Sequence, residues 1–280
     1  MAGSRYIPRQ ADQTVNVSKT HPLAEAGWLV GALSLIGLGL AIVTIFLVDI
    51  FVALVSPERE ARWFSGLEPE GIMLSNGGAE PSPEIQALFD RVSSHWPDSP
   101  YEFRLLISDD EAPNAMALPG GLIIVTEGLL DGVESNNELA FVLAHELGHF
   151  HNRDHLRRFG RMALLGTMFS AISGSESIGI NLSDLTLRSF SREQEQAADA
   201  FGLSLTEATF GHVNGAGDFF ERINDGGDSV LARYLDTHPQ PMDRLAYLSE
   251  LAKTEGWNED GHLEPWGHTD AVEPHGDKTP

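Results

Sequence analysis

The sequence predicts an α+β fold: a mostly helical domain with a small β-sheet, preceded by one transmembrane helix. Three observations support this prediction. An uncharged apolar run covers residues 26–48, several later stretches have helical spacing of apolar residues, and only short runs have strand composition. With 280 residues, the chain is long enough for a domain with a buried core in addition to the apolar run.

Composition excludes several classes of protein. The chain carries 18 basic and 41 acidic residues, a formal net charge of -23. A nucleic-acid partner is therefore not expected, because phosphate binding needs a basic face. The chain contains no cysteine, which rules out disulfides, a cysteine-ligated zinc finger and a cysteine nucleophile.

The apolar run Ala26–Val48 predicts a membrane anchor. As a helix it would measure about 34 Å, against a hydrocarbon core of about 30 Å. A cleaved signal peptide has an apolar core of only about 7–15 residues, and no A-x-A site follows this run. A buried core helix is the other alternative, but this run is apolar all round rather than on one stripe, lies near the N-terminus and has no apolar partner of similar length. With Ile50–Val55 continuing the run after Asp49, we expect an anchor at residues 26–55 in contact with membrane lipid.

Flanking charges suggest an orientation for this anchor. The basic residues before the run are Arg5, Arg9 and Lys19, and those after it are Arg59 and Arg62. The small excess before the run favours a cytoplasmic N-terminus. The following domain would then be extracytoplasmic, and periplasmic in a Gram-negative bacterium.

Composition changes divide the rest of the chain. Residues 56–82 are rich in Glu, Gly, Pro and Ser and are predicted to be a linker. Residues 253–280 are polar and acidic, with scattered histidines, and are predicted to be a disordered tail. The expected organisation is an N-terminal segment at 1–25, the anchor at 26–55, the linker at 56–82, the folded domain at 83–252 and the tail at 253–280.

The folded domain opens with an amphipathic helix and a small sheet. Pro83 begins the helix, whose apolar stripe is Ile85, Leu88, Phe89 and Val92. Strands are predicted at residues 101–107, 114–118 and 122–126, with a turn at Pro119-Gly120-Gly121.

Three further helices are predicted. The first starts after Ser135, where Ser135 and Glu138 fit a capping box. The second, Arg161–Ile172, is too short to span a bilayer alone and could pack in the domain or lie on the membrane surface. The third is Ser191–Leu205, which follows a Gly- and Ser-rich loop at residues 173–184.

The first of these helices carries a metal-binding pattern, His145-Glu146-Leu147-Gly148-His149. Positions i and i+4 share one helix face, so His145 and His149 can present two imidazoles to one ion. Glu146 lies about 100° further round the axis, which suits a general base acting on water beside a zinc ion.

A third protein ligand is needed, and the residues offer two candidates. His155 has the metzincin spacing after His149, but Asn152 replaces the glycine of that pattern. Glu195 lies on the third helix with Asp199 one turn further on. One carboxylate could bind the metal while the other holds a ligand histidine from behind.

Three more segments carry a family resemblance. Glu195-Gln196-Ala197-Ala198-Asp199 resembles the E-x-x-A-D helix of the M48 peptidases. Asn114–Gly121 resembles their N-A-F-A-x-P-G-G strand and turn, and Thr237-His238-Pro239, followed by Arg244, resembles their T-H-P segment with its following Arg. The resemblance runs from about Pro83 to Leu251, with Met116 in place of the usual Phe and Leu245 in place of the frequent Ile.

The resemblance implies a zincin-type (gluzincin) catalytic domain. It implies that His145, His149 and Glu195 bind one Zn2+ per chain and that Glu146 is the catalytic base. The implied activity is that of a metalloendopeptidase on polypeptide substrates, in membrane or envelope protein quality control.

Other residues have candidate roles beside structural ones. The strand Asn114, Ala115, Met116 and Ala117 could pair with an extended substrate or be purely structural. Asp199 could support a ligand histidine. In some M48 members an equivalent of His238 holds the enzyme inactive; it could also stabilise the oxyanion or only shape the turn. Arg244 could bind the oxyanion or pair with Asp199 or Asp243.

Two rival hypotheses stay open. The protein could be a client-binding, chaperone-like factor with latent protease activity. It could also be a structural membrane protein with a decayed site. The sequence leaves the oligomeric state open.

Overall fold

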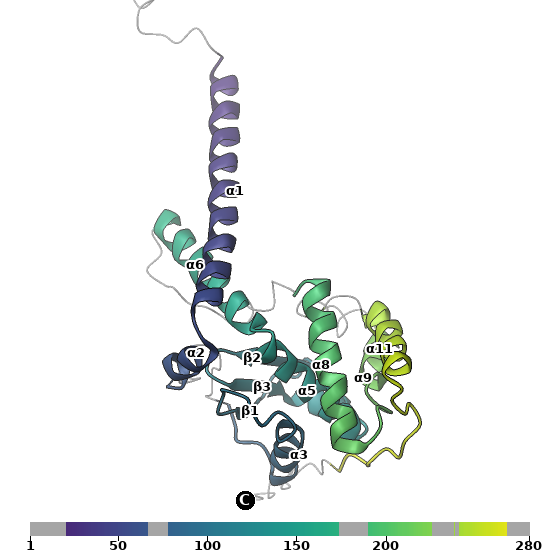
Figure 1. The fold of residues 1–280 in the computed structure, drawn as a ribbon. Helices are drawn as coiled ribbons and strands as arrows, with labels where there is room; N and C mark the ends of the chain where they lie inside the picture. Colours follow the sequence, from purple (N-terminus) through teal and green to yellow (C-terminus); the bar gives the residue numbers. More distant parts are fainter. Residues whose placement is uncertain (1–20, 67–77, 174–189, 226–237, 239–240, 268–280) are drawn as a thin grey trace, which may run out of the picture. The chain divides into compact units, whose positions relative to one another are not determined.

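A computed structural model describes residues 21–66, 78–173, 190–225, 238 and 241–267 (Figure 1). The chain divides into two units, Met1–Phe46 and Leu47–Pro280. The second unit holds every described strand and every described helix after α1, which itself begins in the first unit.

Helix α1, Pro22–Leu54, contains the predicted anchor. Among the described residues it is the one helix long and apolar enough to cross a membrane. Most of its large apolar side chains between Leu23 and Leu47 are exposed, as expected of a surface that faces lipid. The single N-terminal apolar helix is therefore confirmed. The basic residues before it lie outside the described part, and the orientation stays a prediction.

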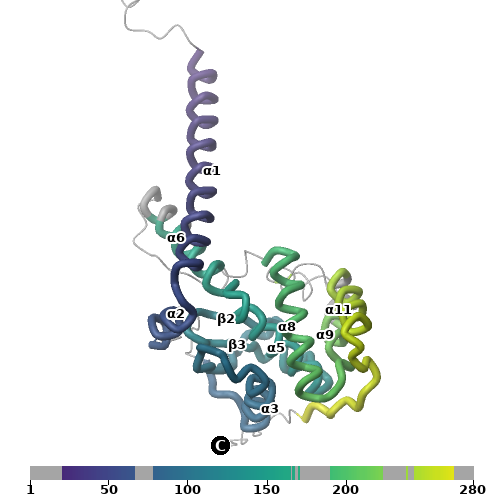
Figure 2. The backbone as a smooth tube through the Cα atoms, viewed as in Figure 1, coloured from purple at the N-terminus to yellow at the C-terminus, as the bar shows by residue number. Residues whose placement is uncertain are grey.

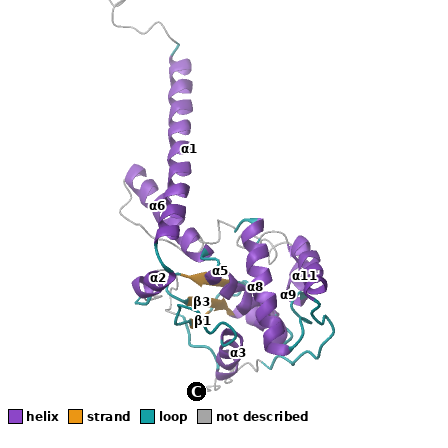
Figure 3. Cartoon of the chain, in the orientation of Figure 1, coloured by secondary structure: helices purple, strands orange, loops and turns teal. Residues whose placement is uncertain are grey.

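The second unit contains a three-stranded sheet, shown in orange in Figure 3. Its strands are β1 (Arg104–Ser108), β2 (Ala115–Leu118) and β3 (Leu122–Thr126), in the order β1-β3-β2. β1 and β3 are parallel, and β2 and β3 are antiparallel. The predicted turn between β2 and β3 forms with Gly120 and Gly121 at φ +88 and +89, where an L side chain would be strained. β1 begins later than predicted, because its partner β3 starts only at Leu122.

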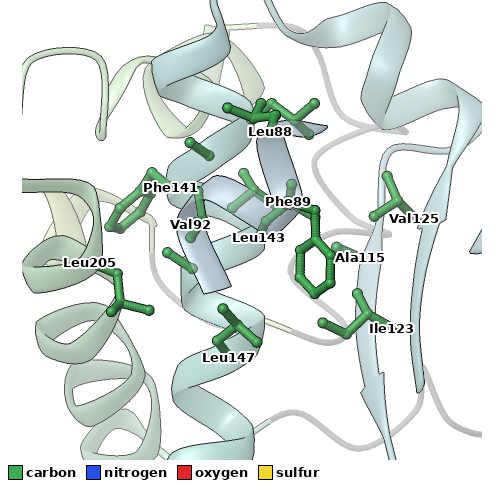
Figure 4. Packing of buried hydrophobic residues seen from close by; sticks show 14 of the residues in the cluster. Leu88, Phe89, Val92, Ala115, Ile123, Val125, Phe141, Leu143, Leu147 and Leu205 are labelled. Carbon is green, nitrogen blue, oxygen red and sulfur yellow. The ribbon is translucent and has the colours of Figure 1, made fainter. Parts of the chain in front are cut away.

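Side chains from residues 129–133 and 213–252 add to the main core, most of which comes from four elements. They are the sheet, α3 (Pro83–Ser93), α5 (Asn136–His151) and α8 (Arg192–Phe210), while α4 (Glu127–Gly132) links the sheet to α5. Figure 4 shows Phe89 and Val92 of α3 packed among the sheet's Ile123 and the α5 side chains Phe141 and Leu147. Every residue of α5 from Asn137 to Phe150 is buried. The mostly helical α+β fold class is thus confirmed.

The start of α5 differs in one detail from a capping box. The Ser135 hydroxyl accepts a hydrogen bond from the backbone N of Glu138, as predicted. The Glu138 carboxylate, however, accepts from the backbone N of Glu134 rather than of Ser135. Glu138 also pairs with Arg222 of α9 (Asp218–Asp225), so a tertiary contact draws its side chain away from the cap.

Two glycines allow α5 and α8 to approach closely. A Cβ at Gly148 would lie 2.6 Å from the carbonyl oxygen of Ala198. A Cβ at Gly202 would lie 2.9 Å from the backbone N of His145. Both distances are shorter than real contacts, and the obstructing atoms are backbone. The small residues therefore set the spacing that brings α8 beside the His145–His149 face.

We expect Gly148→Ala to lower the free energy of unfolding by about 1–3 kcal/mol, because the added methyl group forces α5 and α8 apart. Urea unfolding of the purified chain measures this loss. Gly166→Ala on α6 (Asp154–Ser173) is the matched control, since a Cβ there meets no described atom within 4 Å. Equal stability of the two variants would contradict the close packing of α5 on α8.

Part of the predicted linker is a helix. Residues Pro57–Phe64 form α2, and its Glu60 is completely buried. The end of α1 packs here too: Val48 and Val52 contact Leu156 of α6 (Asp154–Ser173). The linker prediction fails for this part because tertiary contacts, rather than local apolar spacing, order α2. α6 also starts earlier than the predicted Arg161.

The C-terminal helices pack around α8. Helix α8 extends beyond the predicted Leu205 to Phe210 and ends at Gly211, whose φ is +75. It begins with a complete capping box between Ser191 and Gln194. Helices α9 (Asp218–Asp225) and α11 (Pro241–Glu255) pack against each other, and α11 contacts α8 (Figure 2). The predicted loop after Ser173 lies outside the described residues.

The predicted disorder of the tail is wrong for residues 253–267. After α11 the chain returns to the start of α5, where the Trp266 indole N–H donates to the carbonyl of Leu130 over 3.1 Å. The backbone N of Glu264 donates to the Asn137 side chain over 2.8 Å. Two partly buried tryptophans, Trp257 and Trp266, pack on the core, and the apolar surface that they remove from water offsets the acidic composition. The rest of the tail lies outside the described residues.

Candidate metal centre

Four buried side chains converge where α5 meets α8. They are His145 and His149 of α5, Glu195 of α8, and His238. One ligand atom from each lies within 4.8 Å of every other. Each residue is at most 2% exposed. The structure therefore brings together the three candidate ligands of the sequence analysis and adds His238 to them.

Glu195 lies across from both imidazoles. The Nε2 atoms of His145 and His149 are each 3.6 Å from a different oxygen of the Glu195 carboxylate. The one-turn spacing of the histidines places both rings on the α8 side of α5, with ring centroids 4.7 Å apart. The two nitrogens and the carboxylate thus face a common point.

A carboxylate lies beside the Nδ1 atom of each imidazole. His145 Nδ1 lies 3.0 Å from Asp199 Oδ1, and His149 Nδ1 lies 3.4 Å from Asp154 Oδ2. An Nδ1–H that donates to a carboxylate leaves the Nε2 lone pair free for a ligand. Asp199 therefore has the position expected of it. Asp154 was missed, although an acidic residue directly after the Asn152-Arg153 turn was an available signal.

Arg244 of α11 neutralises the two α8 carboxylates. Its guanidinium donates to Asp199 over 2.6 and 2.9 Å, and its Nη1 lies 2.9 Å from Glu195 Oε2. It also stacks over the Phe220 ring at 4.1 Å. Of the partners considered for Arg244, Asp199 is the one that forms the ion pair. Asp243 lies instead beside Arg192, with its Oδ2 3.3 Å from the Nη2 of that residue.

His238 lies over the same point. Its Nδ1 is 3.2 Å from Glu195 Oε1 and its Nε2 is 3.8 Å from Glu146 Oε1. Phe190 stacks on the His149 ring with centroids 3.8 Å apart. No sequence pattern indicated Phe190, because its contact joins segments that only tertiary packing brings together.

Glu146 is positioned beside the cluster rather than within it. It is 1% exposed, and its Oε2 has no hydrogen-bond partner in the part of the chain that the structure describes. A buried carboxylate oxygen without a partner is energetically unfavourable unless water or a ligand satisfies it. This geometry suits a base that acts on a water molecule in the cluster.

Burial and neighbouring charges shift the pKa values of three residues in the cluster. Burial favours the neutral form of Glu195, but the charges of His238 and Arg244 outweigh it and lower the pKa of Glu195 to about 2. Burial, with the nearby Arg244 charge, lowers the pKa of His145. Burial also opposes protonation of His149, yet Asp154, Glu195 and Glu146 together raise its pKa.

The donor set fits a metal ion. It offers two imidazoles and an ionised carboxylate, the ligand types that zinc takes in catalytic sites. The buried His149 Nε2 has no hydrogen-bond partner among the described residues, and a bound cation would satisfy it.

Two other predicted groups lie apart from the cluster. His155 is buried, but its Nε2 bonds to Glu60 and its Nδ1 lies 3.1 Å from the carbonyl oxygen of His149. Ala115, Met116 and Ala117 lie in β2, which forms one edge of the described sheet, and Asn114 directly precedes it. All four are buried.

An HExxH helix that faces a buried glutamate defines a class, the metallopeptidases of the zincin kind. Within that class the chain belongs to peptidase family M48, whose family model matches residues 80–252. The family predicted from the sequence is thus confirmed.

Individual relatives agree with this family. The chain is 29% identical over 159 residues to the mitochondrial metalloendopeptidase OMA1 of Schizosaccharomyces pombe, covering 54% of this chain and 47% of the relative. It is 30% identical over 188 residues to the putative beta-barrel assembly-enhancing protease of Vibrio cholerae, covering 60% and 38%. It is 27% identical over 246 residues to the protease HtpX homolog of Salinibacter ruber, covering 72% and 87%. The chain thus spans less than half the length of the first two of these relatives.

Proposed function

We propose that this protein is a zinc-dependent metalloendopeptidase in which Glu146 activates water. The observation that carries the proposal is the arrangement of His145, His149 and Glu195, with both Nε2 atoms 3.6 Å from the carboxylate. Glu146 lies beside them, and its buried Oε2 has no hydrogen-bond partner among the described residues. Membership of the M48 family supports the same activity.

In this proposal His145, His149 and Glu195 hold one zinc ion. When bound there, the ion would supply Lewis-acid chemistry, namely polarisation of the scissile carbonyl and a lower pKa for water. Glu146 Oε2 takes the proton of the attacking water and later delivers it to the leaving amine. Asp199 and Asp154 keep the two Nδ1 atoms protonated, so that the Nε2 lone pairs point into the cluster.

We place polypeptide substrates along the edge strand β2. An extended substrate would pair its backbone with Asn114–Ala117, and the sheet order leaves one side of β2 without a described strand partner. Backbone hydrogen bonds recognise an extended main chain whatever its side chains are. This mode of binding suits an enzyme that cleaves many different polypeptides.

We further propose a membrane setting. Residues 83–252 form the peptidase domain, and α1 anchors the chain in lipid with its N-terminus in the cytoplasm and the domain outside it. The apolar character of α1 supports the anchor. The name of the Vibrio cholerae relative, a beta-barrel assembly-enhancing protease, supports a role in envelope protein quality control.

Metal removal tests the proposal directly. We expect 1,10-phenanthroline to abolish cleavage of casein by the purified protein and added zinc to restore it, because the imidazoles and the carboxylate alone cannot polarise a peptide carbonyl. Cleavage by the treated and the restored protein is compared under identical conditions. Full activity in the chelated protein would contradict a metal-dependent mechanism.

A second candidate is a client-binding, chaperone-like factor with latent protease activity. The position of His238 favours it, since its Nε2 lies 3.8 Å from Glu146 and 1% of the residue is exposed. A histidine in that place can compete with a substrate for the same space. Client binding by a Glu146 variant separates the two candidates.

A further inference from the structure

Glu60 of α2 is a buried carboxylate outside the candidate metal centre. It is 0% exposed. Its Oε2 accepts hydrogen bonds from the Tyr101 hydroxyl over 3.0 Å and from Arg153 Nη2 over 3.0 Å, and its Oε1 bonds to His155 Nε2. Glu60 precedes residue 80, where the M48 family match begins.

Arg153 links Glu60 to the end of α1. Its Nη1 donates to the carbonyls of Val52 and Val55, each over 2.6 Å. The last carbonyls of a helix lack intrahelical partners, and a positive charge is favourable there. Arg153 has φ +60, the one non-glycine residue with positive φ in the described ranges. Such a conformation persists where surrounding contacts hold it, and here the guanidinium supplies them.

Two residues that follow Arg153, Asp154 and His155, contact His149 from two sides. His155 Nδ1 lies 3.1 Å from the carbonyl oxygen of His149. Asp154 Oδ2, one residue earlier, lies 3.4 Å from the His149 imidazole. The first residues of α6, directly after the turn at Asn152-Arg153, therefore contact both the backbone and the ring of this candidate ligand; this turn and the start of α6 form the α5–α6 corner.

We infer that Glu60 is a positioning residue for the metal centre. Through Arg153 and His155 it holds the α5–α6 corner in place, and that corner orients His149. The end of α1 and helix α2 thereby become part of the metal site's support. The inference rests on the proposed function in that the cluster is taken to bind zinc.

Glu60→Gln in the full chain tests this role. The amide keeps the size of the side chain but leaves Arg153 and His155 without their buried anionic partner. We expect zinc affinity, measured by competition with a chromophoric chelator, to fall about tenfold or more, as for other residues that orient metal ligands. Amide hydrogen exchange at residues 149–155 of the zinc-free protein should become faster.

Two control variants separate positioning from general stability. Glu58→Gln changes an exposed residue of the same helix. Tyr101→Phe removes one hydrogen bond to Glu60, while the contacts of Glu60 with Arg153 and His155 remain. Both should bind zinc as the unaltered protein does. Arg153→Lys is a milder second variant if Glu60→Gln does not fold. It should weaken zinc binding several-fold, because one ammonium nitrogen cannot take the places of both Nη1 at the two carbonyls and Nη2 at Glu60.

Two results would overturn the inference. One is unchanged zinc affinity in folded Glu60→Gln, or in Arg153→Lys where the first variant does not fold. The other is an equal loss of affinity in Tyr101→Phe, which would make the effect one of stability. If the unaltered protein binds no zinc, the proposed function fails, but hydrogen exchange at residues 149–155 still tests the link from Glu60 to the corner.

Discussion

Glu146→Gln should bind zinc normally and lose nearly all cleavage of casein. The glutamine keeps the shape of the side chain but cannot accept the proton of the attacking water. Because Glu146 is not among the four clustered groups, zinc content should stay at one ion per chain. General bases contribute roughly 10²–10⁴-fold to a rate, and we expect a loss of that size in kcat at equal zinc content.

The control for this variant is Glu193→Gln, which removes an exposed carboxylate of α8 and should cleave casein at the normal rate. Undiminished cleavage by Glu146→Gln would end the assignment of Glu146 as the base. Binding of an unfolded client by the inactive variant is measured in parallel. If the Glu146→Gln protein still protects its clients in cells without hydrolysing them, this result favours the chaperone-like function over the protease function.

Glu195→Gln should lower zinc affinity far more than His155→Ala. The first change removes the anionic member of the cluster, whose two oxygens face both Nε2 atoms. A loss above about 100-fold is expected, beyond that of a residue that only orients a ligand. His155 bonds to Glu60 and to the His149 backbone, so its removal should loosen the corner with a smaller loss of affinity.

Metal analysis at limiting zinc measures this ranking, with Glu193→Gln two residues away on the same helix as the control for Glu195→Gln. The reverse order, with His155→Ala the worse binder, would restore His155 as the third ligand. That outcome would also require His155 to leave Glu60, which a structure of the zinc-bound protein would reveal.

Local patterns predicted much of the fold because their causes are local. The capping serine of α5, the turn at Gly120-Gly121 and the strand β3 each appear where the residues predict them. α2 and the tail at 253–267 were mispredicted for the opposite reason. Their order depends on contacts with distant residues, such as Glu60 with Arg153 and Trp266 with Leu130, and no periodicity marks these contacts.

The candidate site divides in the same way. One-turn spacing on α5 was enough to pair His145 with His149, since helix geometry alone puts them on one face. The choice between Glu195 and His155 could not come from spacing, because it depends on how α8 crosses α5. Gly148 and Gly202 decide that crossing by letting backbone meet backbone.

By itself the sequence determined the apolar N-terminal helix, the family, the HExxH helix and the mostly helical α+β class. These follow from periodicity, composition and motif spacing, which act over a few turns of chain. Only the tertiary structure placed Glu195 and His238 beside the two histidines, set Asp154 behind His149, and joined the end of α1 to the α5–α6 corner through Arg153 and Glu60. Such contacts form between segments far apart in the chain, where burial and charge pairing, rather than local propensity, determine which side chains meet.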